Sequence, residues 1–318
     1  MSNPFKNISV IGAGAVGCFF GGMLARAGHH VTLIGRQNHV WAIEKFGLEM
    51  VCQNFHEFVK IKASTDLDSI SNADLVLFCV KSPDTDETAR QIAPLLKKNT
   101  VILSLQNGID NCDRLRKIIP NPSYPAVVYV ASAMGESGQI RHFGRGELVI
   151  GDMVETSDID SNIQSHLHLK NIAELFAASH VPCKISGDIK KALWSKFLVN
   201  CIYNGISAIT QMSYGDLVQS PEINSLIDQL TSEFLCIAAQ ENVSITLDEA
   251  TQMNQMIAKT MSAQKSSTAQ DLQRGKSTEI DFLNGLIVKK GLEYNIPTPN
   301  HQTIWQLIKG LELTSSPP

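Results

Sequence analysis

The sequence predicts an α/β protein whose first half is a parallel β-sheet covered by helices and whose second half is an all-α C-terminal domain. Two observations predict this. Apolar, strand-like runs alternate with segments of helical spacing through the first half, which indicates a parallel sheet with right-handed crossovers. From about Asp188, apolar residues recur at helical spacing almost to the end of the chain. We therefore expect domains at residues 1–187 and 188–318.

The expected strands are continuous apolar runs, which are typical of parallel strands buried on both faces. They occupy residues 7–12, 31–35, 73–80, 100–105 and 124–133. Helices are expected at 15–28, 41–47 and 83–98, and a hairpin is expected from 48–51 and 58–63. In the second half, helical segments are expected at 189–208, 221–241, 247–263, 268–274, 279–290 and 299–312.

Composition narrows the classes of function. The 318 residues are 43% hydrophobic and carry a net charge of −4 without a basic patch, so we expect neither nucleic acid nor a membrane surface as a partner. No run reaches the roughly 18–20 apolar residues of a membrane-spanning helix. The 7 cysteines are scattered without C-x-x-C, and the histidines form no H-E-x-x-H. We therefore expect a cytoplasmic protein with no disulfide framework and no metal.

The stretch IGAGAVG carries three glycines in the G-x-G-x-x-G pattern, at Gly12, Gly14 and Gly17. The pattern alone is weak, but here it follows an expected strand and opens an expected helix, as a dinucleotide site requires. Such a turn lets a pyrophosphate approach the backbone amides at the helix start. The sequence therefore predicts a Rossmann-type dinucleotide-binding domain. Its cofactor-binding turn comprises Gly12, Ala13, Gly14, Ala15, Val16 and Gly17.

The end of the second strand indicates which nicotinamide cofactor is bound. NAD sites usually have an acidic residue there, whereas this chain reads VTLIGRQ and has Arg36. A guanidinium suits the 2′-phosphate of NADP through paired hydrogen bonds and charge. The alternative is a solvated surface arginine.

Two further strand ends carry polar residues, and ligands of such sheets bind beyond the carboxyl ends of the strands. Lys81 follows LVLFCV, and Asn107 follows VILSLQ. Both are candidates for contact with the cofactor. Lys81 could equally be a solvated turn lysine, and Asn107 could serve as a turn former before Gly108.

The segment WSKFLVNCIYN places Lys196, Asn200 and Asn204 four residues apart on an otherwise apolar helix. Residues at this spacing lie on one helix face. Asparagine is a poor helix former, so two of them suggest a specific use. We interpret the stripe as the wall of an interdomain cleft, with an ammonium that polarises a carbonyl and delivers a proton. The alternative is a solvated stripe or amides bound to backbone.

A second polar cluster lies in SSTAQDLQRGKSTEIDFLNG. Ser267 with Gln270, and Thr278 with Asp281, have the spacing of capping boxes, which places Glu279 in a first helical turn. Ser267 could then hold a substrate carboxylate, and Glu279 could bond a substrate hydroxyl or carbonyl-derived oxygen. The alternative is that both are ordinary helix-start residues.

Together these motifs resemble the ketopantoate reductase (2-dehydropantoate 2-reductase) family. The resemblance covers nearly the whole chain. It rests on GAGAVG, GHHVTLIGR, LFCVK, LQNG, WSKFLVNCIYN, STAQDLQRGKSTEIDFLNG and IPTPNHQTIWQLIKGLE. The K-x-x-x-N-x-x-x-N pattern followed by T-E-I-D is its specific part.

The resemblance implies an NADP-dependent oxidoreductase that acts on a CH-OH group and reduces 2-dehydropantoate to pantoate, in pantothenate and coenzyme A biosynthesis. It implies that Lys196 is the proton donor and that Glu279 lies near the substrate C2 oxygen and the cofactor ribose. A small 2-keto acid is then the ligand, and a homodimer is the expected assembly. The other implied contacts are Asn107, Asn200, Asn204 and Ser267 for substrate, with Ser267 on its carboxylate, and Arg36, Lys81, Asn107 and Ala133 for cofactor.

One position departs from the family pattern. Tyr214 stands where the family usually has a substrate-binding asparagine, which leaves the identity of the 2-keto acid open. The alternatives are a reductase of another branched 2-keto acid, a β-hydroxyacid dehydrogenase, and an NADP-binding sensor without turnover.

Overall fold

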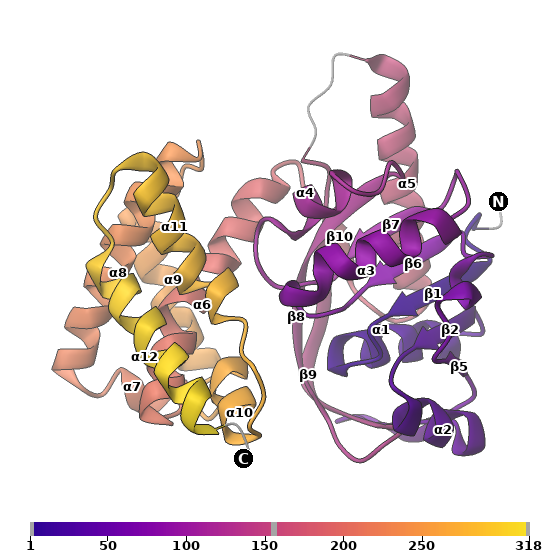
Figure 1. Ribbon diagram of the computed structural model, residues 1–318, viewed down its shortest axis with the longest axis horizontal. Helices are drawn as coiled ribbons and strands as arrows, with labels where there is room; N and C mark the ends of the chain where they lie inside the picture. Colours follow the sequence, from indigo (N-terminus) through magenta and orange to yellow (C-terminus); the bar gives the residue numbers. More distant parts are fainter. Residues whose placement is uncertain (1–2, 154–157, 316–318) are drawn as a thin grey trace. The chain divides into compact units, whose positions relative to one another are not determined.

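A mostly parallel β-sheet dominates the first part of the chain (Figure 1). The computed structural model describes residues 3–153 and 158–315. The sheet order is β4-β3-β9-β8-β7-β6-β1-β2-β5, and β10 pairs with β9. The strands are β1 (Asn7–Ile11), β2 (His30–Ile34), β3 (Leu48–Val51), β4 (His56–Val59), β5 (Lys62–Ser64), β6 (Leu75–Phe78), β7 (Val101–Ser104), β8 (Ser123–Met134), β9 (Gln139–Ile150) and β10 (Cys183–Ile185).

The centre of the sheet is parallel, as the continuous apolar runs predict. Strand β1 pairs in parallel with both β2 and β6, so that Ile8 lies opposite Val31 on one side and Leu75 on the other. Every residue of β6 and β7 is buried. Because helices cover both faces of such strands, their side chains all enter a core, and the predicted α/β class is confirmed.

Helices and short 3-10 turns connect the strands of this N-terminal unit, residues 1–189. The helices are α1 (Ala15–Arg26), α2 (Gln37–Phe46), α3 (Thr85–Ile92), α4 (Asn111–Arg116) and α5 (Ile159–Ala178), and the 3-10 turns are η1 (Leu67–Ile70), η2 (Ser82–Asp84) and η3 (Ala93–Leu95). The expected single helix at 83–98 is wrong. It divides into η2, α3 and η3, because Pro83 and Pro94 each lack the N–H that a continuous helix needs.

The expected hairpin is confirmed in part. Strands β3 and β4 pair antiparallel, with Leu48 opposite Val59. The end of the predicted second strand behaves differently, because Lys62–Ser64 forms β5 and pairs in parallel with β2. Strand β9 was not predicted. It pairs antiparallel with β8 and contains β-bulges beside Tyr129 and Ala131, which interrupt the alternation that sequence patterns detect.

The second unit, residues 190–318, is helical throughout its described part, and the predicted all-α C-terminal domain is confirmed (Figure 1). Trp194, Phe197 and Phe234 form its aromatic core, with ring centroids 5.5–5.7 Å apart. Among the described residues, no helix combines the length and the apolar character needed to cross a membrane. The elements of the second unit are α6 (Ile189–Thr210), α7 (Tyr214–Leu217), α8 (Pro221–Gln240), α9 (Leu247–Thr260), α10 (Ser267–Gln273), η4 (Ile280–Phe282), α11 (Asn284–Tyr294) and α12 (Pro299–Ser315).

His301 joins three helices of this unit from a fully buried position on α12. Its Nε2 lies 3.0 Å from the carbonyl oxygen of Leu230 on α8, and its Nδ1 lies 3.0 Å from the amide nitrogen of Asn284 on α11. Both contacts suit a neutral ring, which donates through Nε2 and accepts at Nδ1. Burial lowers the pKa of His301 to about 4, although the nearby Glu233 carboxylate opposes this shift.

We predict that His301 makes the free energy of unfolding depend on pH. Its folded pKa is about 4 and its unfolded pKa about 6.5, so the unfolded chain binds the extra proton between these values. The contribution is complete above about pH 6.5 and is lost as the pH falls toward 4, with about 2 kcal/mol lost by about pH 5. Urea unfolding of wild type and His301→Gln at about pH 7.5 and pH 5 measures it. Equal pH dependence in both proteins would contradict the assignment.

Candidate functional site

The glycine turn between β1 and α1 has a geometry that requires glycine. Gly12 has φ +93°, in the left-handed region, and a Cβ there would lie 2.7 Å from the backbone carbon of Cys79. A Cβ on Gly17 would lie 2.3 Å from the carbonyl oxygen of Gly12. The absence of a side chain at Gly17 therefore lets α1 pack directly on the turn, as the motif predicts.

The N-terminus of α1 is open to an anion. Gly14 is the N-cap residue, it is exposed, and α1 has no side-chain cap and no acidic residue in its first turn. A Cβ added at Gly14 would have no atom within 4 Å. The first backbone amides of an α-helix lack intrahelical acceptors and carry partial positive charge, so they can receive a pyrophosphate. Residues Gly12–Gly17 thus fit the phosphate part of a dinucleotide.

Arg36 lies beside this turn, at the N-cap position of α2 and two residues after the end of β2. The amides of Gly12 and Ala13 both donate to the carbonyl oxygen of Ile34, at 3.1 and 3.0 Å, which holds the end of β2 against the turn. Arg36 is exposed, and among the described residues it forms no ion pair. Its guanidinium is therefore available to a phosphate near the glycine turn.

A buried polar network joins the loops that follow β6 and β7 and carry Lys81 and Asn107. The carbonyl oxygen of Asn107 accepts hydrogen bonds from Ser82 Oγ at 3.2 Å and from Asn111 Nδ2 at 2.6 Å. Gln106 Nε2 donates to the carbonyl oxygen of Val80 at 3.1 Å. These bonds bring the two predicted residues to adjacent loops at the carboxyl edge of the sheet.

Sequence reasoning missed the residues that build this network. Gln106 and Asn111 are both buried, and Thr85 binds both, accepting from Gln106 Nε2 at 2.7 Å and donating to Asn111 Oδ1 at 3.1 Å. The signal was a set of amides and hydroxyls placed just after two buried strands, where unpaired polar groups would be costly. Their role is to fix the backbone that presents Lys81 and Asn107.

Ala133 occupies a different part of the sheet. It is half-buried near the end of β8 and lies opposite Arg141 of β9. Strand β8 continues well past the end of β7, because Ser104, the last residue of β7, already lies opposite Pro125. The contact of Ala133 with the cofactor stays a prediction.

Helix α6 carries the predicted polar stripe of Lys196, Asn200 and Asn204. Lys196 and Asn200 are half-buried, whereas Asn204 is 4% exposed. The neighbouring aromatic residues Trp194 and Phe197 pack against Phe234 and fix the rotation of the helix. The three polar side chains therefore lie along one side of a helix that is held firmly on its other sides.

The capping arrangement predicted for α10 is wrong by one residue. Its N-cap is Ser266, whose Oγ accepts from the amide of Ala269 at 3.0 Å. Gln270 instead donates to the carbonyl oxygen of Lys265 at 3.2 Å. Ser266 is fully buried and Ser267 is exposed, so Ser267 is the serine that faces outward from the helix start.

The second predicted capping box, Thr278 with Asp281, is also wrong. Thr278 Oγ1 donates to Glu312 at 2.8 Å, and the Asp281 carboxylate accepts from Trp305 and Lys309 at 2.7 and 2.9 Å. Glu279 is half-buried and lies at the N-cap of η4, one residue before the turn in which it was expected. Glu312, Trp305 and Lys309 all belong to α12, so these are long-range pairings that local spacing does not reveal.

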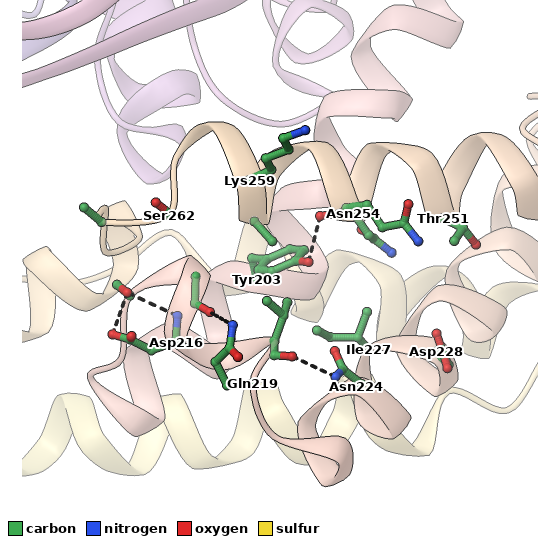
Figure 2. A pocket seen from close by; sticks show the side chains of 16 residues that line it. Tyr203, Asp216, Gln219, Asn224, Ile227, Asp228, Thr251, Asn254, Lys259 and Ser262 are labelled. Atoms are coloured by element: carbon green, nitrogen blue, oxygen red, sulfur yellow. Dashed lines mark hydrogen bonds between the residues drawn. The ribbon is translucent and has the colours of Figure 1, made fainter.

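A cavity of about 1130 Å³ lies elsewhere in the helical unit, among α6, α7, α8 and α9. Its lining contains none of the predicted site residues. Several of its polar groups are engaged with one another. The Tyr203 hydroxyl donates to the carbonyl oxygen of Asn254 (Figure 2), at 2.9 Å. Ser213 Oγ donates to Asp216 Oδ2 at 2.6 Å. The cavity is therefore not a candidate for the site that the sequence predicts.

The comparison with known families covers both units. Residues 8–155 match the profile described as "Ketopantoate reductase PanE/ApbA", and residues 188–312 match "Ketopantoate reductase PanE/ApbA C terminal". A curated 2-dehydropantoate 2-reductase of Halobacterium salinarum is 29% identical over 305 residues, which are 95% of this chain and 97% of that protein.

Two solved structures extend the comparison. A PanE/ApbA family ketopantoate reductase from Ralstonia eutropha is 46% identical, with a TM-score of 0.89 over 97% of this chain and 99% of that chain. D-mandelate dehydrogenase, solved with NADH and anilino(oxo)acetate, is 25% identical, with a TM-score of 0.89 over 97% of this chain and 99% of that chain.

We predict that the two glycines of the turn respond differently to a methyl group. Gly17→Ala should lower the free energy of unfolding by about 2 kcal/mol or more, because its Cβ meets a backbone oxygen that cannot move away. Gly14→Ala is the matched control and should cost less than about 1 kcal/mol, since its Cβ meets open space. Urea unfolding compares them, and equal losses would contradict the packing of α1 on the turn.

Proposed function

This chain belongs to the ketopantoate reductase PanE/ApbA family, and we therefore propose that it is an oxidoreductase that reduces 2-dehydropantoate to pantoate with NADPH. The product would serve pantothenate and coenzyme A biosynthesis. The observation that carries the proposal is the stripe on α6, where one firmly packed helix holds an ammonium and two amides at four-residue spacing. A small, polar keto acid is the ligand that such a set recognises.

The N-terminal unit would hold the cofactor. Gly12–Gly17 and the start of α1 would receive the pyrophosphate, and Arg36 would receive the 2′-phosphate. Lys81 and Asn107 would lie toward the nicotinamide end, with Ala133 lining the cofactor. When bound, NADPH supplies the hydride. The absence of an acidic residue after β2 favours NADPH over the NADH that the D-mandelate dehydrogenase structure contains.

Lys196 would act as the general acid. As the keto carbon accepts hydride, the C=O π bond opens, a C–H bond forms and negative charge grows on the oxygen. The Lys196 ammonium stabilises that charge and delivers the proton that completes the hydroxyl, after which it recovers a proton from water. Positioned proton transfer of this kind typically accelerates a reaction by about 10²–10⁴-fold.

The remaining polar residues would bind and orient the substrate. Asn200 and Asn204 supply neutral hydrogen-bonding groups from α6, and Asn107 would contact both substrate and cofactor. Ser267, exposed at the start of α10, would bond the substrate carboxylate. Glu279 would bond the C2 oxygen and the cofactor ribose.

A second candidate function is the reduction of another 2-keto acid. Two observations favour it: the full-length likeness to D-mandelate dehydrogenase, and Tyr214 at a place where the resemblance leads us to expect asparagine. The decay of NADPH absorbance with 2-dehydropantoate, 2-ketoisovalerate and phenylglyoxylate, run side by side, separates the candidates. A preference for 2-ketoisovalerate or phenylglyoxylate would mean that this compound's class, and not 2-dehydropantoate, is the substrate. If none of the three is reduced, the chain is a dinucleotide-binding protein without this activity.

We further propose that the protein lies in the cytoplasm. Each of the seven cysteines lies in the described part of the chain and is a free thiol there, which suits a reducing compartment.

We also propose that the protein is a homodimer. Light scattering after gel filtration should give twice the mass of one chain, and a single-chain mass would contradict the dimer.

Lys196→Ala should lower kcat by about 10²–10⁴-fold while leaving NADPH affinity nearly unchanged, because the ammonium acts on the substrate oxygen. Steady-state kinetics and fluorescence titration with NADPH measure the two quantities. Lys289→Ala is the matched control, since Lys289 is an exposed lysine of α11. A variant that keeps most of its kcat, or that loses NADPH binding instead, would refute the assignment.

Arg36→Asp should weaken NADPH binding by at least about tenfold and leave NADH binding nearly unchanged, because the lost ion pair involves the 2′-phosphate that NADH lacks. Arg90→Asp, an equal charge change at an exposed position of α3, serves as the control. Equal losses for both cofactors would refute the phosphate role.

A further inference from the structure

Asn204 uses one end of its amide within the helical unit. Its Oδ1 accepts a hydrogen bond from the Tyr214 hydroxyl at 3.2 Å, and its backbone carbonyl oxygen accepts from Ser266 Oγ at 3.1 Å. Asn204 is 4% exposed, so this environment is nearly closed. An asparagine amide has an acceptor end and a donor end, and a partner for one end fixes the direction of the other.

The donor end of Asn204 stays available. Its Nδ2 has no hydrogen-bond partner within residues 3–153 and 158–315. It is also not one of the fully buried polar atoms of these residues that lack a partner, so part of its surface is exposed. Nδ2 therefore keeps access to solvent, while Oδ1 faces Tyr214. A ligand beside this part of α6 would meet an N–H donor.

Tyr214 is held in the position that produces this orientation. Its backbone amide donates to the carbonyl oxygen of Gln264 at 2.9 Å, and its ring meets that of Tyr203 edge to face at 5.4 Å. The residue is 8% exposed. Burial, and secondarily Tyr203, raises the pKa of the Tyr214 phenol, so its hydroxyl keeps its proton. That hydroxyl points at Asn204 Oδ1, to which it donates.

We propose that Tyr214 is a positioning residue for the reaction, which orients the Asn204 amide so that it presents N–H rather than C=O to the substrate. The inference rests on the proposed function, and it deepens it by naming the substrate chemistry read at this point: an oxygen that accepts a hydrogen bond, as in a carboxylate or hydroxyl. A substrate group that only donates would find no acceptor there. Tyr214 acts through Asn204 and not by direct contact with the substrate.

The first test is Tyr214→Phe, which keeps the ring and removes the hydroxyl. Without that donor the Asn204 amide loses its orientation, so KM for the 2-keto acid should rise about tenfold, while kcat and KM for NADPH change less than about twofold. Tyr203→Phe is the matched control. It also removes a buried phenol hydroxyl, but one that binds the carbonyl oxygen of Asn254, as Figure 2 shows, and its KM should be unchanged.

A double-mutant cycle separates positioning from contact. In an Asn204→Ala background, Tyr214→Phe should have no further effect on KM, because the amide it orients is absent. If the KM increase in the double variant equals the product of the increases in the two single variants, the proposal is overturned, since Tyr214 would then act independently of Asn204. A fall in kcat with KM unchanged would overturn it as well.

A second readout does not depend on turnover. In asparagine-labelled protein, Tyr214→Phe should shift the side-chain amide resonances of Asn204, and Tyr203→Phe should leave them in place. If the wild type reduces no 2-keto acid, the proposed function fails, and this readout still decides whether Tyr214 orients Asn204. Unchanged Asn204 resonances in Tyr214→Phe would overturn the inference.

Discussion

The packing of α6 is the constraint on which the account of this protein depends. Trp194 and Phe197 lock the helix against Phe234. With these sides committed to the core, the helix cannot rotate, so the remaining side carries Lys196, Asn200 and Asn204 in one direction. Core packing therefore controls the chemistry of the site, because burial of the apolar sides of α6 determines the direction in which its ammonium and two amides point.

Much of the fold follows from local pattern. Continuous apolar runs predict β6 and β7 because strands covered on both faces bury every side chain. The glycine spacing predicts the turn before α1 because a Cβ on Gly17 would meet the carbonyl oxygen of Gly12 within the same short stretch of chain. The break of α3 before Pro94 follows from proline chemistry that the helical spacing concealed. The parallel pairing of β5 with β2 could not be predicted, because it depends on partners distant in sequence.

The site shows the same division. The stripe on α6 could be predicted because four-residue spacing alone places it on one helix face. The choice of Ser266 as the cap of α10 depends on burial against α6, where its Oγ binds the carbonyl oxygen of Asn204, and adjacent serines cannot be told apart by local sequence. The sequence alone shows that Tyr214 departs from the family pattern, but its bond to Asn204 depends on the packing of α7 beside α6.

A crystal structure with NADP⁺ and an unreactive 2-keto acid analogue tests the central claim most directly, because it measures the distance from Lys196 Nζ to the keto oxygen. The account predicts a hydrogen bond of about 3 Å, with the Asn204 amide nitrogen facing a substrate oxygen. A keto oxygen bound by another residue, with Lys196 out of hydrogen-bonding reach, would contradict it.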